Sequence, residues 1–339
     1  MKIAEMNNVR MLKSEDYNWL FNTITGHFIR WDKDMNDDPE YSPYGPEIMD
    51  IEISTVCSRA CSWCYKSNTA KGKYMSFDTF KKMFDKFPKT VTQIAFGIGD
   101  IDGNPDLWEI MKYCRDNGVV PNITINGDRM TDEYYDKLVE LCGAVAISHY
   151  DNDQVCFNAI KELSKRGLKQ INIHKLLSEE TFESCKELLD KKIDGLNAIV
   201  FLWLKPKGLR NNLHQLGSLK KYKELVEYAF DKKANIGFDS CSASSFLKAV
   251  HGRTDYESLK TMTEPCESTL FSYYINTEGM GFPCSFTEDE SKGVDAVNCK
   301  DFLRDVWFAE ETAEFRIKVM SNTDCNGCRM CQAFNLEVN

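Results

Sequence analysis

Three cysteines lie close together in the string CSRACSWCYKSN, at Cys57, Cys61 and Cys64. The string follows a strand-like segment, residues 49–56, so the thiols are predicted to lie on a loop at a strand end. Thiolates at this Cys-x3-Cys-x2-Cys spacing can bind one face of an iron–sulfur cube and leave one iron without a protein ligand. Such an iron can bind a small molecule and reduce it. The spacing therefore predicts a redox cluster with an exchangeable site.

Other roles also fit clustered cysteines. They could bind zinc with a remote fourth ligand, although structural zinc sites favour paired Cys-x2-Cys units. They could pack as small hydrophobic side chains, and disulfides would require an oxidising compartment. A second group of cysteines and an alternating strand–helix pattern favour the cluster.

The second group lies near the C-terminal end of the sequence and contains Cys266, Cys284, Cys325, Cys328 and Cys331. Zinc is an alternative for this group because Cys-x2-Cys is its usual pair of ligands. An iron–sulfur cluster is favoured because the first group already indicates that metal chemistry. Among the remaining cysteines, four fall in helical or core patterns and are predicted to be buried, namely Cys114, Cys142, Cys156 and Cys185. Cys241 and Cys299 are left without a role.

An aromatic residue, Trp63, precedes the third cysteine of the first group, so the motif reads Cys-x3-Cys-x-aromatic-Cys. This motif resembles the signature of the radical S-adenosylmethionine (SAM) superfamily. The resemblance implies that SAM binds a [4Fe–4S] cluster held by the three cysteines, and that Trp63 contributes to cofactor binding. It also implies that reductive cleavage of SAM yields a 5′-deoxyadenosyl radical, which takes a hydrogen atom from a substrate. No residue is assigned to the substrate reaction.

The same resemblance implies further SAM contacts at Gly97, Ile98, Gly99, Asp100, Asn126 and Ser148. The first four replace the usual Gly-Gly-Glu at the end of the second barrel strand, with an isoleucine in place of one glycine and an aspartate in place of the glutamate. Glycines suit this position because backbone groups must approach the ligand closely. Asn126 begins an Asn-Gly pair that local turn chemistry also explains.

The second group resembles the SPASM and twitch modules of a subset of radical SAM enzymes, through its Cys-x12-Gly-x4-Cys element from Cys266 to Cys284. The resemblance implies one auxiliary [4Fe–4S] cluster in a twitch-like module. The expected ligands are Cys266, Cys284, Cys325 and Cys328, with Cys331 as a substitute for one of them or an unused neighbour.

Short β-rich runs alternate with amphipathic segments from residue 50 onward. Strands are predicted at 50–56, 91–97, 121–125, 144–148, 170–176, 197–204 and 235–239, and helices at 76–87, 104–117, 131–141, 178–190 and 218–233. This alternation predicts an α/β fold built from parallel βαβ units. About six units are too few for a full eight-fold barrel, so we expect a partial (β/α)6 TIM-like barrel with a small C-terminal twitch/SPASM-like module.

The expected organisation has four parts: an N-terminal extension (1–46), the barrel (47–240), a linker (241–265) and the auxiliary module (266–339). Residues 18–31 read as a hairpin that turns near Thr25-Gly26. A second hairpin, 271–284, is predicted to turn at Glu278-Gly279, and residues 302–320 read as a helix.

The chain has 339 residues, 14 cysteines and a formal net charge of −10. This charge argues against nonspecific nucleic-acid binding, which depends on a cationic surface. No apolar stretch is long enough to span a membrane, and the first residues lack the apolar centre of a signal peptide. Together with the cysteine content, these features predict a reducing, cytoplasmic location without a membrane or nucleic-acid partner.

The leading hypothesis is a radical SAM oxidoreductase or maturase that acts on a peptide, a protein or a small molecule. The family implies a flavodoxin or ferredoxin as electron donor. Two alternatives from other classes are an iron–sulfur electron-transfer or scaffold protein and a zinc-stapled interaction domain. Two histidines at strand ends, His149 and His174, are expected to be hydrogen-bonded wall residues that could face the cavity.

Overall fold

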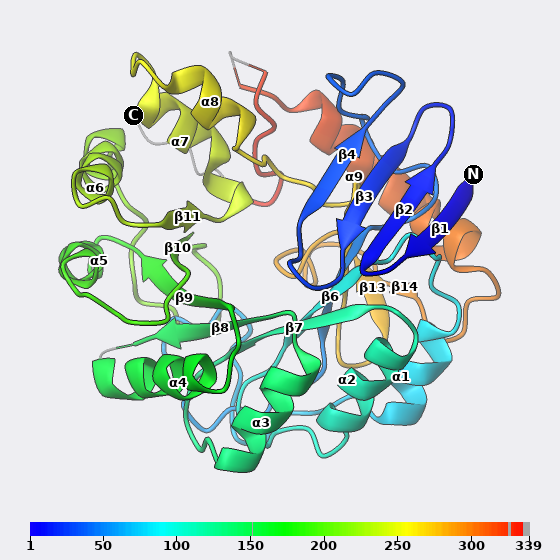
Figure 1. Cartoon of the computed structure of the whole chain (residues 1–339), viewed down its shortest axis with the longest axis horizontal. Helices are drawn as coiled ribbons and strands as arrows, with labels where there is room; N and C mark the ends of the chain where they lie inside the picture. The colour runs from blue at the N-terminus through cyan, green and yellow to red at the C-terminus, as the bar shows by residue number, and fades with distance from the viewer. Residues whose placement is uncertain (151, 325–326, 335–339) are drawn as a thin grey trace.

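A computed structural model describes residues 1–150, 152–324 and 327–334. Its centre is a sheet with the strand order β11-β10-β9-β8-β7-β6-β5-β12-β13-β14. Seven neighbouring strands run parallel: β5 (Ile48–Glu52), β6 (Gln93–Gly97), β7 (Val120–Ile125), β8 (Ala144–His149), β9 (Gln170–Leu177), β10 (Ala198–Trp203) and β11 (Ile236–Phe238). The sheet curves into an open arc, which confirms the predicted partial barrel (Figure 1).

Six helices connect successive parallel strands and cover the outer face of the arc: α1 (Phe77–Phe84), α2 (Leu107–Asp116), α3 (Asp132–Leu141), α4 (Asp153–Lys165), α5 (Phe182–Leu189) and α6 (Leu219–Asp231). Polar caps start several of them; for example, the Ser76 hydroxyl accepts from the backbone of Thr79 at 3.2 Å. Helix α4 was not predicted, although Cys156, Ala159, Ile160 and Leu163 show the helical spacing that buries one face.

Strand alternation sends opposite side chains to the helices and to the inside of the barrel. In β9, Ile171 and Ile173 are fully buried under the helix layer. Asn172 and His174 alternate with them. Their side chains face the inside of the barrel and are only partly buried. In the register of the sheet, His174 is the partner of Ser148 in β8, so polar side chains from neighbouring strands meet near the open mouth.

The N-terminal residues form a separate antiparallel sheet from β1 (Lys2–Met6), β2 (Val9–Lys13), β3 (Asn18–Asn22) and β4 (Phe28–Trp31). The β3–β4 hairpin was predicted, whereas the β1–β2 hairpin was not. Leu12, Trp19 and Phe21 are completely buried in its core. Arg10 fastens the sheet to the barrel by donating to the carbonyls of Lys89 and Gly118, at 2.9 and 2.8 Å.

The segment expected to be a linker contains helices instead. A short turn, η1 (Ser240–Ser242), leads into α7 (Ala243–Val250) and α8 (Tyr256–Thr261). Helix α7 forms because its apolar side chains face the core, with Leu247 and Val250 buried. This segment is therefore packed structure between the barrel and the C-terminal part.

The predicted hairpin is present as β12 (Ser272–Ile275) and β13 (Met280–Phe282), followed by β14 (Val294–Asp295). β12 lies parallel to β5, so the hairpin extends the barrel sheet at the edge opposite β11. The single helix expected at 302–320 is split into a π-helical turn, η2 (Leu303–Trp307), and α9 (Glu310–Ser321). The break occurs at Ala309, whose ψ of 151° is extended.

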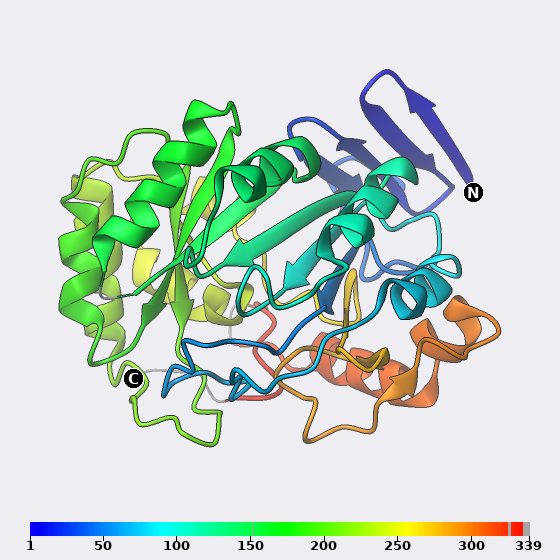
Figure 2. The ribbon, with the colours of Figure 1, turned by 90° about the horizontal axis from the view of Figure 1, so that it is seen from below.

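Three segments that are distant in sequence gather on one side of the barrel: the chain after β5, the loop after β10 and the C-terminal segment (Figure 2). α9 packs beside the N-terminal sheet, where Val319 joins the same apolar cluster as Trp19. Within the described ranges, no helix has the length and apolar character needed to cross a membrane.

Candidate functional site

The three cysteines of the first group lie on the loop that follows β5. Backbone hydrogen bonds shape this loop: the Cys57 N–H donates to the Thr69 carbonyl at 2.9 Å, and the Cys64 N–H donates to the Cys61 carbonyl at 3.2 Å. All three thiols are partly exposed. Burial and the neighbouring Cys57 raise the pKa of Cys61, which also interacts electrostatically with Cys64. The loop thus presents three sulfur donors on one short stretch of chain.

The end of β6 supports this loop from below through a glycine. A Cβ atom at Gly99 would lie 2.2 Å from the carbonyl oxygen of Val56 and 2.5 Å from the Cβ of Cys57, so no other residue fits there. Gly97 differs, because a Cβ there would only reach ordinary contact, 3.5 Å from the Cα of Glu52. Gly99 is therefore required for the close packing of the cysteine loop on the strand end.

Asp100 fixes the loop by hydrogen bonds. Its carboxylate accepts from the Ser58 N–H at 2.8 Å and from the Asn126 side-chain amide at 3.2 Å. Only 2% of Asp100 is exposed, so its bond to Asn126 forms away from solvent, whereas the bond from the exposed Ser58 is partly buried. The structure thereby brings together the loop, the end of β6 and the turn after β7. The predicted SAM contacts of Asp100 and Asn126 stay predictions.

Aromatic and charged side chains lie on the other side of the loop. The Trp63 ring is 6.5 Å from the ring of Tyr150, whose hydroxyl interacts with Ser148. The Arg59 guanidinium lies 4.1 Å from the centre of the Tyr150 ring and forms an ion pair with Asp128 at 2.7 Å. Sequence reasoning singled out Trp63 and Ser148, but missed the side chains that connect them. Ile98, also predicted, packs against the main core.

The donor set of the loop suits an iron–sulfur cluster, because thiolates are the usual ligands of such clusters. The chemistry does not require the sulfurs to meet at a single point, as four ligands of one zinc ion must. In the parts of the chain that the structure describes, no three His, Cys, Asp or Glu side chains are arranged to hold a single metal ion.

The C-terminal cysteines divide into two places. Cys266 interacts electrostatically with Cys284 and Cys331, so three predicted ligands lie near one another. Cys328 is buried elsewhere, against Leu247 of α7. Cys325 lies outside the described residues. The four cysteines predicted to be structural are all buried, as expected: Cys114, Cys142, Cys156 and Cys185.

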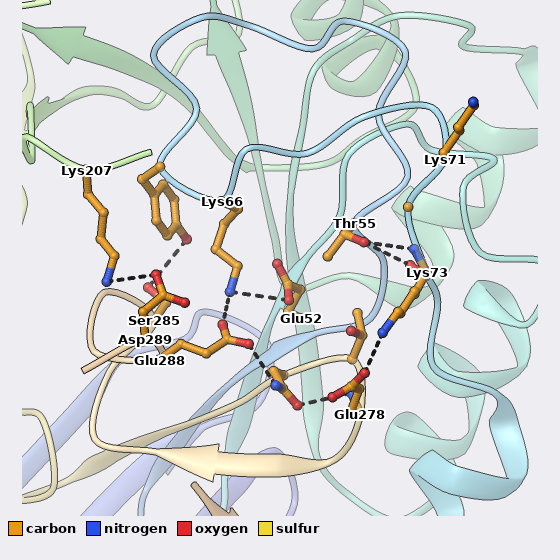
Figure 3. A pocket seen from close by; sticks show the side chains of 14 residues that line it. Glu52, Thr55, Lys66, Lys71, Lys73, Lys207, Glu278, Ser285, Glu288 and Asp289 are labelled. Atoms are coloured by element: carbon orange, nitrogen blue, oxygen red, sulfur yellow. Dashed lines mark hydrogen bonds and ion pairs between the residues drawn. The ribbon is translucent and has the colours of Figure 1, made fainter. Parts of the chain in front are cut away.

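A cavity of about 350 Å³ opens between the cysteine loop and the β12–β13 hairpin (Figure 3). Lys66, two residues after Cys64, donates to the Tyr274 hydroxyl at 2.8 Å and pairs with Glu52 at 3.4 Å and with Glu288. Burial raises the pKa of Glu52 despite the attraction of Lys66. On the opposite wall, Lys73 pairs with Glu278 at 2.6 Å. No motif in the sequence indicated this charged cavity.

The two cysteine groups touch through their neighbours. The rings of Tyr65, which follows Cys64, and Phe286 are 4.4 Å apart, and the Tyr65 hydroxyl lies 3.4 Å from the Ser285 hydroxyl. The loop after β10 covers this contact: a Cβ at Gly208 would lie 2.3 Å from the Cys64 carbonyl oxygen. The two groups therefore belong to one packed region.

The two strand-end histidines have different surroundings. His149 lies under the helix layer, where it bonds to Asp153 at 2.7 Å and to Lys175 at 3.1 Å, so it is not a cavity residue. His174 faces the inside of the barrel, 3.4 Å from the Thr124 hydroxyl. Burial lowers the pKa of His174 to about 4, which keeps its ring neutral at physiological pH.

With this geometry, the chain is similar to several known proteins. Residues 51–207 match the family model described as the Radical SAM superfamily. A tungsten-containing aldehyde ferredoxin oxidoreductase cofactor-modifying protein from Pyrococcus furiosus is 30% identical over 95 residues, which cover 27% of this chain and 27% of that protein. An AdoMet-dependent heme synthase from Nitratidesulfovibrio vulgaris is 23% identical over 314 residues, covering 82% and 83% of the two chains.

The fold extends over almost the whole chain in a solved structure. Streptococcus suis SuiB bound to precursor peptide SuiA superposes with a TM-score of 0.75 and 14% identity, covering 96% of this chain and 93% of that one. At this identity, the similarity establishes the fold. It includes the partial barrel and the segments on both sides of it.

Proposed function

We propose that this chain, in which residues 51–207 form a radical SAM domain, is an enzyme that takes a hydrogen atom from a peptide or protein substrate. The family implies SAM and a [4Fe–4S] cluster as cofactors. The observation that carries the proposal is the loop after β5, where Cys57, Cys61 and Cys64 rest on the strand end at Gly99. A second [4Fe–4S] cluster at the C-terminal cysteines assists electron transfer or substrate binding.

When bound, SAM and the reduced cluster supply a 5′-deoxyadenosyl radical for hydrogen abstraction. The residues of the chain provide positioning. Asp100 and Asn126 hold the loop through hydrogen bonds, and Gly97, at the exposed end of β6, leaves room for an incoming ligand because it has no side chain. Trp63, Tyr150 and Ser148 form the wall where the nucleoside of SAM is expected. Such preorganised polar groups and the exclusion of water are what a protein adds to cofactor chemistry.

A peptide or protein substrate is supported by the fold of the peptide-bound SuiB structure, which matches this chain along nearly its full length. The cavity between the cysteine loop and the hairpin offers both signs of charge, from Lys66, Lys73, Glu278 and Glu288. Backbone and side-chain groups of a peptide could pair with such a lining. The expected electron donor is a flavodoxin or ferredoxin, and the expected location is the cytoplasm.

A small-molecule substrate is the second candidate. It is favoured by the similarity to an AdoMet-dependent heme synthase over most of the chain and by the cavity of about 350 Å³, which lies in the size range of small-ligand sites. Mass spectrometry of candidate peptides and of small metabolites, incubated with enzyme, SAM and reductant in deuterated and ordinary buffer, distinguishes the two.

The test of the enzyme proposal is the formation of 5′-deoxyadenosine. The anaerobically reconstituted protein, given SAM and dithionite, is expected to release it, and the triple variant C57A/C61A/C64A is expected to release none. Cys156→Ala is the matched control, because Cys156 is a buried cysteine on α4, away from the loop. Absence of 5′-deoxyadenosine from the intact, iron-loaded protein would overturn the proposal.

Metal analysis and EPR spectroscopy of the same preparation also distinguish the two alternative protein classes. An electron-transfer or scaffold protein would contain iron and sulfide, but SAM would leave the EPR spectrum of the reduced first cluster unchanged. A zinc-stapled interaction domain would contain zinc in place of iron and sulfide. We expect iron, sulfide and a SAM-dependent change in the spectrum.

A further inference from the structure

Cys241 had no role in the sequence, yet it lies where the barrel ends. It belongs to the turn η1, directly after β11, which forms one edge of the sheet. Its thiol interacts electrostatically with that of Cys331, in the C-terminal segment, and both cysteines pack against the main apolar core. Two thiols from distant parts of the chain therefore meet at this position.

The contact connects Cys241 to the other C-terminal cysteines. Cys331 also interacts electrostatically with Cys266, which precedes β12, and with Cys284, which follows β13. Cys266 and Cys284 interact with each other as well. The segments that carry these cysteines are also in direct contact, since Arg329 donates to the Cys266 carbonyl at 2.9 Å and the rings of Phe286 and Phe334 are 5.7 Å apart. The sulfurs therefore form one group with Cys331 as the shared neighbour. Each cysteine comes from a different segment of the chain.

Cys328 lies apart from this group, because the turn at Gly327 directs it elsewhere. The Asp324 side chain accepts from the Cys328 N–H at 2.9 Å, and Gly327 has a φ of +80°, which turns the chain sharply. The Cys328 sulfur packs with Ala243 and Leu247 of α7. Its strongest electrostatic neighbours include Asp324 and Arg329. Its orientation is that of a core side chain.

A buried cation accompanies the group of four. Lys205 is only 6% exposed, forms an ion pair with Asp239, and interacts electrostatically with both Cys241 and Cys331. A nearby cation favours the thiolate form that binds metal. A cluster with four thiolate ligands carries net negative charge, and the Lys205–Asp239 pair places a cation, together with its counterion, next to that charge.

We propose that the second iron–sulfur cluster is held by four cysteines from four separate segments, namely Cys241, Cys266, Cys284 and Cys331. This inference rests on the second cluster of the proposed function and names its ligands. It excludes Cys328 from the set, and it makes Cys241 the ligand that the Cys-x2-Cys spacing could not indicate. Four protein thiolates complete the coordination of a [4Fe–4S] cluster, so this cluster has no open iron.

This ligand set places the proposed cluster between the two ends of the barrel sheet. Cys241 follows β11 at one edge of the sheet, whereas Cys266 and Cys284 flank the hairpin added at the other edge. The cluster therefore joins the two ends of an open barrel, whose edge strands β11 and β14 do not pair with each other in the described sheet. Figure 1 shows the C-terminal segment, in red, returning next to α7 across this opening. Metal ligation of this kind contributes to folding directly.

The test uses the full chain in the background C57A/C61A/C64A, which leaves only the second site. Iron and sulfide per chain are measured after anaerobic reconstitution, together with the EPR spectrum of the reduced protein. Cys241→Ala and Cys328→Ala are compared as matched substitutions of two cysteines in adjoining parts of the structure. Circular dichroism of each variant checks that the fold is retained.

The background protein is expected to bind about four irons. Cys241→Ala is expected to lose most of them or to leave a three-iron cluster with its own EPR signal, and Cys328→Ala is expected to change neither. If Cys241→Ala does not fold, Cys241→Ser replaces it, and the expected result is a shifted EPR spectrum. Unchanged iron and spectrum in the Cys241 variant, with loss in Cys328→Ala, would overturn the ligand set. A background protein without iron and sulfide would instead refute the second cluster itself.

Discussion

The two cysteine groups are built on opposite principles. The first places Cys57, Cys61 and Cys64 on one loop, which rests on the barrel through Gly99 and Asp100. The second collects its sulfurs from segments that are far apart in the chain. Local spacing therefore determines the first group, whereas tertiary folding determines the second.

This difference implies that the two proposed clusters contribute differently to the stability of their surroundings. The first loop lies on a barrel whose apolar core is extensive, so its support exists before a cluster binds. Around the second group, the described C-terminal residues after α9 form only short turns and an isolated bridge. There the proposed cluster would supply much of the order that a core would otherwise supply.

The largest expected effect comes from breaking the support of the first group. Gly99→Val places side-chain atoms where the Val56 carbonyl and the Cys57 Cβ lie, at 2.2 and 2.5 Å from the first added carbon. We expect the first cluster to be lost, so iron per chain falls from about eight to about four. The loss of the SAM-dependent EPR change reports the first site separately from the second.

Gly97→Ala is the matched control, since a Cβ at Gly97 meets nothing closer than 3.5 Å. It should retain both clusters by iron analysis. Full iron content in Gly99→Val would mean that the loop does not depend on this packing. The contrast between the two regions would then be wrong.

What the sequence predicts follows the same division. Elements that local sequence patterns encode were predicted well. The βα units, the Ser76 cap, the hairpin from β12 to β13 and the loop with Cys57 are all in the structure. Each of these depends on residues that are neighbours in the chain. The charged cavity around Lys66 was not foreseen, because its wall combines the cysteine loop with the hairpin.

Long-range pairing explains the remaining differences. The Cys-x2-Cys unit suggested that Cys325 and Cys328 act together, but the turn at Gly327 directs Cys328 into the apolar contacts of α7. Cys241 and Cys331 meet only because β11 and the C-terminal segment share one side of the barrel. No local spacing carries that information. The helices of the expected linker were missed although Leu247 and Val250 show helical periodicity.

Removal of both clusters should affect the two regions unequally. After chelation of iron under denaturant-free conditions, amide exchange in residues 266–334 is expected to accelerate at least about tenfold, a loss of about 1.4 kcal/mol of protection. Strands β6 to β9 should keep their protection, because their core is formed by packed side chains such as Ile94 and Ile171. Hydrogen-exchange mass spectrometry of the loaded and iron-free protein measures both. Equal acceleration in barrel and C-terminal segment would show that the barrel also depends on metal.

A more local effect is expected at the buried carboxylate of the first region. Asp100→Ala leaves the Ser58 N–H and the Asn126 amide without their acceptor. The Asn126 amide is the buried one of the two donors. An unsatisfied buried donor costs about 1–3 kcal/mol, so the free energy of unfolding of the iron-free protein should fall by about 2 kcal/mol. Urea unfolding monitored by circular dichroism gives this value.

Asp102→Ala supplies the comparison for that measurement. Asp102 accepts from Arg129 at 3.1 Å, but its side chain is 40% exposed. Exposed ion pairs contribute about 0–1 kcal/mol. Similar losses in the two variants would indicate that burial of Asp100 does not matter for the loop.

The smallest effect concerns the contact that joins the two regions. The rings of Tyr65 and Phe286 lie 4.4 Å apart, and aromatic pairs of this kind contribute about 0.5–1.5 kcal/mol beyond the area they bury. Single and double leucine substitutions, Tyr65→Leu and Phe286→Leu, should therefore show a coupling free energy of about 1 kcal/mol in a double-mutant cycle. The control cycle pairs Tyr65→Leu with Phe308→Leu, since Phe308 packs over Arg316 in the C-terminal helical region and its substitution should be additive. A coupling near zero between Tyr65 and Phe286 would mean that this ring contact does not couple the chain after Cys64 to the chain after Cys284.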